Sequence, residues 1–177
     1  MKADSAVSGP PVILIPATPA SLRAELHSTE ALALHLNFAI DPGWPPELYD
    51  KAAVEWGLAL LEGDPDAAPW GPHYFAIGSG GRARLLIGAG GFKGKPDESG
   101  EVEIGYSIVA SHQRQGLATA AAEGLVARAF TDPRVTAVVA QTLPSLAASI
   151  RVLEKVGFRS DGEGDEEGVI RFTMKRK

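Results

Sequence analysis

A short segment in the middle of the chain combines residues suited to binding a phosphorylated ligand. Residues 113–118 read Gln-Arg-Gln-Gly-Leu-Ala and lie where a predicted strand gives way to a predicted helix at residues 115–130. The first turn of a helix exposes unpaired backbone N–H groups and the positive end of the helix dipole, which together favour a diphosphate. Gly116 lets phosphate oxygens reach the backbone because it has no Cβ. Arg114 adds positive charge, and the Thr119 hydroxyl is a further candidate donor.

Two neighbouring segments give this one a context. Upstream, residues 101–109 form a predicted strand whose carboxylates, Glu101 and Glu103, alternate with apolar residues and therefore share one face. Downstream, residues 148–158 (Ala-Ser-Ile-Arg-Val-Leu-Glu-Lys-Val-Gly-Phe) read as a helix that ends at a C-cap glycine and leads into another strand. A carboxylate-bearing strand, an anion-binding helix start and a second helix thus follow one another.

The bulk composition excludes several other kinds of site. Lys and Arg number 17 and Asp and Glu 22, a formal charge of −5, whereas a nucleic-acid binder needs a basic surface. The chain has no cysteine, which excludes disulfides and thiolate sites, and its histidines lack metal-ligand spacing, so no metal is expected. The apolar runs are too short to span a bilayer, and the N-terminus lacks the pattern of a secretory signal. We expect a cytoplasmic protein with no membrane partner.

The remaining pattern predicts a flexible N-terminal tail at residues 1–10 and one folded domain at residues 11–177. Helix formers fill residues 19–37 and 47–62, and three strands joined by turns follow. The third strand leads into a helix, a strand, a helix and a last strand. This order predicts an α+β, three-layer fold with a mixed sheet and helices on both faces. The strands are expected at residues 12–15, 73–77, 84–92, 102–109, 135–141 and 169–174, and the later helices at 115–130 and 145–156.

Taken together, these segments resemble the GNAT superfamily of acyl-CoA-dependent N-acetyltransferases, most closely its RimJ/RimL branch. Residues 113–118 match the family's Q/R-x-x-G-x-G/A signature, residues 102–106 its V-E-I-G-Y segment, and residues 148–158 its A-S-x-R-V-L-E-K-x-G-F segment. The resemblance implies the GNAT fold, with a mostly antiparallel sheet of six or seven strands that splits between two central parallel strands. It also implies acetyl-coenzyme A as co-substrate and direct acetyl transfer to a primary amine.

The resemblance places the coenzyme along the split. Backbone amides of residues 113–119 would hold the pyrophosphate, and the main chain of Ile108 and Val109 would pair with the pantetheine arm as an added strand does. A backbone N–H near Ile108 would polarise the thioester carbonyl. Arg151 and Lys155, one helical turn apart, would lie near the phosphates or the adenine. The implied cofactor-binding set is Ile108, Val109, Gln113, Arg114, Gln115, Gly116, Leu117, Ala118, Thr119, Arg151 and Lys155.

The implied chemistry needs a base and a proton donor. An amine attacks the thioester once it is neutral, and a carboxylate or a water chain removes its proton. Glu103 is the first candidate and Glu101 the second. Strand alternation puts both on the same face, so the sequence barely separates them. Many family members use a tyrosine as the acid where this chain has Leu153. In the RimJ/RimL branch the serine of the A-S pair takes this place, which makes Ser149 the candidate.

Several alternatives stay open at this level. Leu146 stands where the family usually carries an asparagine, so a non-catalytic acyl-CoA-binding or sensing domain is the main rival. A nucleotide-binding protein is another, although the chain lacks the Walker lysine and a full G-x-G-x-x-G. Glu103 as an exposed strand carboxylate and Ser149 as a helix cap are the structural alternatives. The acceptor is open among protein N-termini, amino acids, polyamines and aminoglycosides, and the chain is expected as a monomer or homodimer.

Overall fold

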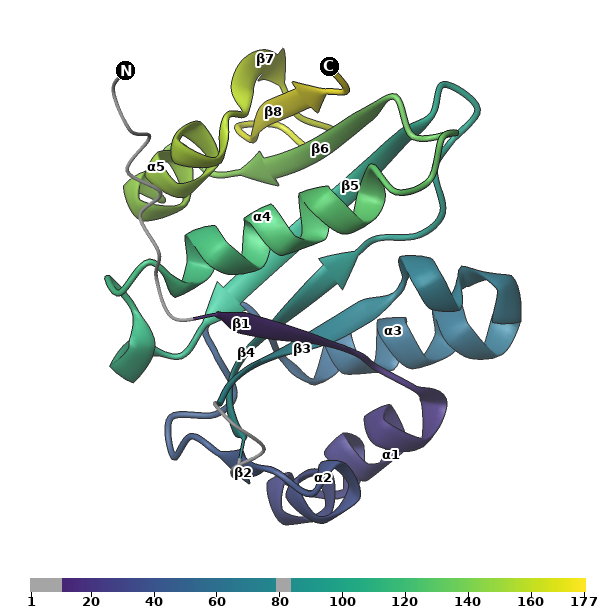
Figure 1. Cartoon of the computed structure of the whole chain (residues 1–177), viewed down its shortest axis with the longest axis vertical. Helices are drawn as coiled ribbons and strands as arrows, with labels where there is room; N and C mark the ends of the chain where they lie inside the picture. Colours follow the sequence, from purple (N-terminus) through teal and green to yellow (C-terminus); the bar gives the residue numbers. More distant parts are fainter. Residues whose placement is uncertain (1–10, 79–83) are drawn as a thin grey trace, which may run out of the picture.

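The computed structural model describes residues 11–78 and 84–177, so the expected N-terminal tail and most of the turn expected at residues 78–81 lie outside the described residues. Figure 1 shows how the helices and strands are arranged. The strands are β1 (Val12–Pro16), β2 (Ala39–Ile40), β3 (Pro72–Ile77), β4 (Leu85–Phe92), β5 (Glu101–Ile108), β6 (Ala137–Thr142), β7 (Arg159–Glu163) and β8 (Ile170–Lys175). The helices are α1 (Pro19–His27), α2 (Thr29–Leu36), α3 (Lys51–Gly63), α4 (Leu117–Ala129) and α5 (Ala147–Val156), with 3-10 turns η1 (Pro65–Trp70) and η2 (Ala110–His112).

The strands form one sheet in the order β1-β3-β4-β5-β6-β8-β7, with the short β2 beside β4. The pairs β5–β6 and β2–β4 are parallel and the others antiparallel, which confirms the mixed, mostly antiparallel sheet. Its eight strands exceed the six or seven expected. The strand pattern missed β7 because its sequence, Arg-Ser-Asp-Gly-Glu, is exposed throughout and has no β-branched or aromatic residue; pairing with β8 forms it.

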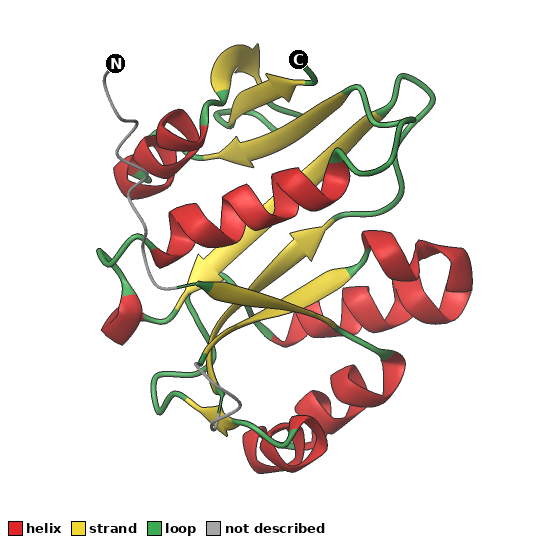
Figure 2. Cartoon of the chain, viewed as in Figure 1, coloured by secondary structure: helices red, strands yellow, loops and turns green. Residues whose placement is uncertain are grey.

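Helices cover both faces of the sheet, as Figure 2 shows in red. On one face, Leu117 and Leu125 of α4 and Leu153 of α5 pack with alternate strand residues such as Val138. On the other face, α1, α2 and α3 enclose a second apolar cluster, which includes Leu22, Leu32, Val54 and Leu61. In the described part of the chain no helix is both long and apolar enough to cross a membrane.

Glycines in β4 let β5 approach unusually closely. A Cβ built on Gly88 would lie 2.5 Å from Ser107 O and 2.7 Å from Ile108 Cδ1. A Cβ on Gly90 would collide with Gly105 O and lie 2.7 Å from Tyr106 Cα. Real Cβ atoms do not come this near, so the Gly-rich sequence of β4 is a condition for the position of β5.

The parallel pair β5–β6 holds together over only part of its length. Register pairs run from Glu101↔Ala137 to Ile104↔Ala140, although β5 continues to Ile108 and β6 to Thr142. Beyond Ile104, β5 stays with β4 and β6 stays with β8. The two strands therefore diverge, which gives the split expected between central parallel strands.

Replacing Gly90 by alanine is expected to destabilise the protein by about 1–3 kcal/mol, because the added methyl group overpacks the β4–β5 contact. Urea denaturation measures this change in the free energy of unfolding. Gly63→Ala is the matched control, since a Cβ on that last residue of α3 meets nothing within 4 Å. Equal stability of Gly90→Ala and wild type would contradict the close approach of the strands.

Candidate active site

A cleft of about 670 Å³ opens where β5 and β6 separate. Its walls come from β4, β5, β6, the start of α5, the loop between β7 and β8, and the segment that leads into α3. Exposed apolar side chains stand at its mouth, namely Leu48, Trp56 and Leu143. The cleft is thus partly apolar, but its strand wall carries Glu103 and the β7–β8 loop adds Asp165 and Glu166.

Helix α4 begins beside this split without a side-chain cap. Its N-cap residue, Gly116, has φ 78°, and Arg114 two residues earlier has φ 57°. These left-handed conformations start the helix two residues later than expected, at Leu117, and turn the chain sharply before it. Leu117 and Thr119 are buried, so they contribute backbone N–H groups rather than side chains to any ligand. An uncapped helix start offers unpaired backbone N–H groups that can bind an anion.

Side-chain hydrogen bonds hold the segment before α4 in place. Gln113 Nε2 donates to Ile108 O at 2.9 Å, and Gln115 Nε2 donates to Ser111 O at 3.2 Å. Asp41, which is buried, accepts from Ser111 Oγ at 2.9 Å and lies 3.1 Å from His112 Nδ1. The glutamines of the signature therefore brace the loop. Gln113 N itself donates to Ala110 O at 3.3 Å, so the amides offered to a ligand are those after Gln113.

The main chain of β5 offers hydrogen-bonding groups to the split. Val109 N donates to Ile87 O at 2.9 Å, and Lys93 N donates to Glu103 O at 2.9 Å. Because main-chain groups alternate in direction along a strand, the N–H groups of Tyr106 and Ile108 face away from β4, toward the gap. Val109 has its C=O occupied as well, by His112 N. Of the two residues expected to meet pantetheine, Ile108 offers its N–H to the gap, although its C=O accepts from Gln113 Nε2, whereas both main-chain groups of Val109 are occupied.

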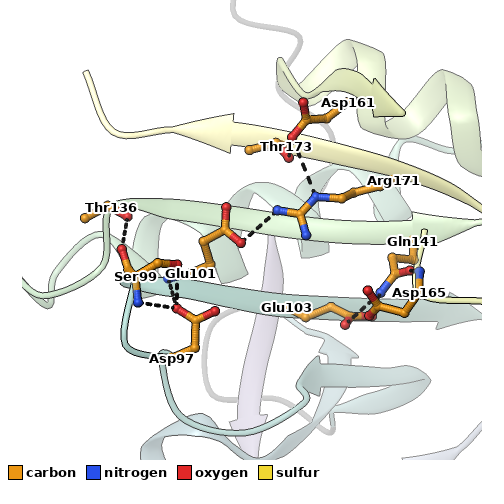
Figure 3. Close-up of polar contacts among 10 residues, drawn as sticks. All are labelled: Asp97, Ser99, Glu101, Glu103, Thr136, Gln141, Asp161, Asp165, Arg171 and Thr173. Atoms are coloured by element: carbon orange, nitrogen blue, oxygen red, sulfur yellow. Dashed lines mark hydrogen bonds and ion pairs between the residues drawn. The ribbon is translucent and has the colours of Figure 1, made fainter. Parts of the chain in front are cut away.

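The two candidate bases have different surroundings, although they share a strand face (Figure 3). Glu103 lines the cleft, where its Oε1 lies 2.5 Å from Lys93 Nζ and its Oε2 accepts from Gln141 Nε2 at 3.1 Å. Glu101 does not line the cleft, and its Oε2 is paired with Arg171 at 2.8 Å. The hydrogen bond to Glu101 raises the pKa of Arg171 above its ordinary value. Glu101 thus belongs to an ion pair at the closed end of the split.

Helix α5 and its N-cap bring to the cleft the serine expected as proton donor and the two leucines that depart from the family pattern. Ser149, Leu146 and Leu153 all line it. Tyr106 Oη donates to the backbone oxygen of Ser149 at 3.4 Å, and burial raises the pKa of this phenol. Arg151 and Lys155 lie on the exposed side of the same helix. The structure therefore brings Glu103, Tyr106 and Ser149 to one cleft and leaves Glu101 outside it.

Sequence reasoning missed three residues around Glu103, namely Lys93, Gln141 and Asp165. Lys93 follows β4 directly, and Gln141 ends the apolar run of β6 on the face of Glu103. A polar residue at the end of a buried strand was the one available signal for Gln141. Asp165 gave none, because it lies in a Gly- and acid-rich tract that looks like an irregular loop.

Comparison with known proteins identifies the family of the chain. Residues 13–159 match the family model described as an acetyltransferase (GNAT) domain, so the chain belongs to the GNAT acetyltransferase family. The uncharacterized N-acetyltransferase YjdG of Bacillus subtilis (strain 168) is 37% identical over 73 residues. The alignment covers 41% of this chain and only 44% of the length of that curated relative.

Solved structures share the fold over nearly the whole chain. A putative GnaT-family acetyltransferase from Bordetella pertussis superposes with a TM-score of 0.63 at 20% identity, covering 100% of this chain and 98% of that one. Mycobacterium smegmatis RimJ in complex with CoA-disulfide gives a TM-score of 0.58 at 23% identity, covering 93% and 81%. These likenesses confirm the GNAT fold, and the RimJ/RimL branch stays a prediction.

Asp41→Ala is expected to loosen the loop before α4, because it removes a buried acceptor of three contacts, including the Gly43 N–H. The free energy of unfolding should fall by about 1–3 kcal/mol, and hydrogen exchange should quicken at residues 110–116. Asp50→Ala is the control, since that carboxylate caps α3 elsewhere. Unchanged exchange at residues 110–116 in Asp41→Ala would show that this anchor does not hold the loop.

Proposed function

We propose that this chain transfers the acetyl group of acetyl-coenzyme A to a primary amine by direct attack on the thioester. The observation that carries the proposal is the uncapped start of α4 at Gly116, set beside the divergence of β5 from β6. One feature binds a diphosphate and the other accepts an extended arm, and a CoA thioester contains both. The thioester supplies an activated acetyl group with a thiolate leaving group.

The residues present fit such a co-substrate. Amides of the first turn of α4 would bind the pyrophosphate, with Arg114 adding charge from an exposed position. Pantetheine would pair with Tyr106 and Ile108, whose N–H groups face the gap, so we move the role expected for Val109 to Tyr106. The Ile108 N–H would stabilise negative charge on the thioester oxygen. Arg151 and Lys155 remain our candidates for contacts to the outer phosphates or the adenine.

Glu103 is our proposed general base because, unlike Glu101, it lines the cleft. Its ion pair with Lys93 is half-exposed on the lysine side, at 53%, and such pairs open at little cost. The carboxylate then accepts the proton of the bound amine. Ser149 is the proposed proton donor to the thiolate, with the Tyr106 phenol beside it. The presence of Ser149, with Leu153 in place of tyrosine, supports the RimJ/RimL branch.

A second candidate is a non-catalytic acyl-CoA-binding domain of the same fold. It is favoured by Leu146 and Leu153, apolar side chains that line the cleft where the family usually has polar ones. The two candidates share the coenzyme and differ in whether an amine reacts.

The first experiment measures thermal stability with acetyl-CoA and then thiol release over a panel of amines. We expect acetyl-CoA at about 100 times its Kd to stabilise the protein by about 2.7 kcal/mol, and at least one amine to release CoA thiol. ATP and NAD are controls for a nucleotide site. Absence of stabilisation rejects the coenzyme, whereas stabilisation without thiol release supports the binding domain.

Glu103→Gln is expected to lower kcat about 100-fold or more, because a well-placed general base contributes about that much, while the Kd for acetyl-CoA stays the same. Glu101→Gln is the matched substitution on the same strand face, and its effect should be confined to stability. Initial rates and isothermal titration of acetyl-CoA give the two quantities. A larger loss of kcat in Glu101→Gln than in Glu103→Gln would transfer the role of base.

A further inference from the structure

Hydrogen bonds hold the Gly- and acid-rich tract at residues 161–168 against the site. Asp165 N donates to Gln141 Oε1 at 2.7 Å, and Gln141 Nε2 donates to Asp165 Oδ2 at 2.7 Å (Figure 3). The side-chain amide of Gln141 therefore holds both the backbone and the side chain of Asp165. This contact joins the β7–β8 loop, residues 164–169, to the middle of the sheet.

Gly164 makes this docking possible. A Cβ at that position would collide with Gln141 Oε1 and lie 2.7 Å from Val169 Cγ1. The loop also closes on itself, since Gly164 N donates to Val169 O at 2.7 Å. Because Asp165, Glu166 and Val169 line the cleft, the arrangement that Gly164 permits sets one wall of it.

The same amide reaches the proposed base. Gln141 Nε2 donates to Glu103 Oε2 at 3.1 Å, on the carboxylate oxygen that Lys93 leaves free. The Asp165 N–H can only donate, so it fixes the amide oxygen on its own side and turns the NH2 group toward the carboxylates. Gln141 is half-buried on β6, whereas the ammonium of Lys93 is reached by solvent. When Lys93 moves away, Gln141 is the group that still orients Glu103.

We propose that Gln141 is a positioning residue that orients the Glu103 carboxylate toward the amine and holds the β7–β8 loop as the wall of the acceptor end. This inference rests on the proposed function for its catalytic half, and its structural half is independent of it. It gives the acid-rich tract a role in the site and predicts that substitutions at Gln141 affect the amine rather than acetyl-CoA.

The charges around Glu103 suggest a substitution that tests its contact with Gln141. Lys93 faces it from β4, and Asp165 and Glu166 face the cleft from the β7–β8 loop. Arg171 on β8 is engaged by Glu101 and Asp161, and the side of α3 that lines the cleft offers Ala53 and Trp56 without charge. Gln141→Glu keeps the acceptor for Asp165 N–H but puts a negative charge against Glu103. The like charges repel each other, so the Glu103 carboxylate should turn away from residue 141.

The test compares Gln141→Glu, Gln141→Leu and Gly164→Ala with wild type. In carbon NMR of ¹³C-labelled glutamate at one fixed pH, the Glu103 carboxyl signal should shift in Gln141→Glu, because the hydrogen bond from Gln141 Nε2 is lost and a like charge replaces it. Hydrogen exchange at Asp165 should quicken in Gln141→Leu and Gly164→Ala. With the reactive amine, Gln141→Leu should lower kcat about tenfold, a part of what a well-placed base contributes. Gly164→Ala should raise mainly the KM of the amine.

The outcomes separate this inference from the proposed function. If wild type neither binds acetyl-CoA nor releases thiol, the proposed function fails, and NMR and hydrogen exchange still decide whether Gln141 positions Glu103 and the loop. If wild type is active but Gln141→Leu keeps its kcat and its slow exchange at Asp165, the inference is overturned. A Glu103 carboxyl signal in Gln141→Glu at its wild-type position also overturns it. Unchanged KM for acetyl-CoA in all variants supports it.

Discussion

The pairing of β5 with β6 ends after Ile104 and Ala140, and the rest of the site depends on that ending. Each of these strands pairs over a greater length with its other neighbour. The glycines of β4 draw β5 in so closely that no side chain fits between them, while β6 pairs with β8 along its whole length. Two twisted half-sheets are thus joined only along a short seam, residues 101–104 paired with residues 137–140. Beyond this seam they separate, because each follows its own twist. The gap exposes main-chain groups that a folded protein otherwise satisfies.

Polar side chains along this seam form two groups, one at its paired end and one where the strands separate. At the paired end, Glu101 reaches across β6 to Arg171 on β8, and Arg171 in turn contacts Asp161 on β7. This ion-pair row links the two half-sheets (Figure 3). At the parting end, Glu103 and Gln141 meet across the same face, but they line a cleft. Two glutamates separated by one residue therefore have unlike surroundings, because Glu101 lies at the start of the paired region and Glu103 next to its end, where the cleft opens.

The local sequence predicted what depends on backbone rules. The expected helix at residues 115–130, the alternating strand before it and the C-cap at Gly157 all appear within a few residues of their expected bounds. The start of α4 came later than expected because Arg114 and Gly116 adopt left-handed conformations that helix periodicity does not reveal. Strand β7 was missed because only its partner stabilises it. The sequence ranked Glu103 only slightly above Glu101, since their partners Arg171, Lys93 and Gln141 come from other parts of the chain.

The same distinction explains why the donor can be read from this sequence and the acceptor cannot. A diphosphate and an extended arm are bound by N–H groups, and a helix start and a strand offer those wherever the right turn occurs. In our proposal the amine would instead meet side chains from α3, β6 and the β7–β8 loop, which only the folded chain brings together. With Leu146 and Leu153 facing the cleft, α5 adds little polarity there. If the proposed function holds, selectivity for the amine depends on the strand wall and on the β7–β8 loop, and the side-chain amide of Gln141 contacts both.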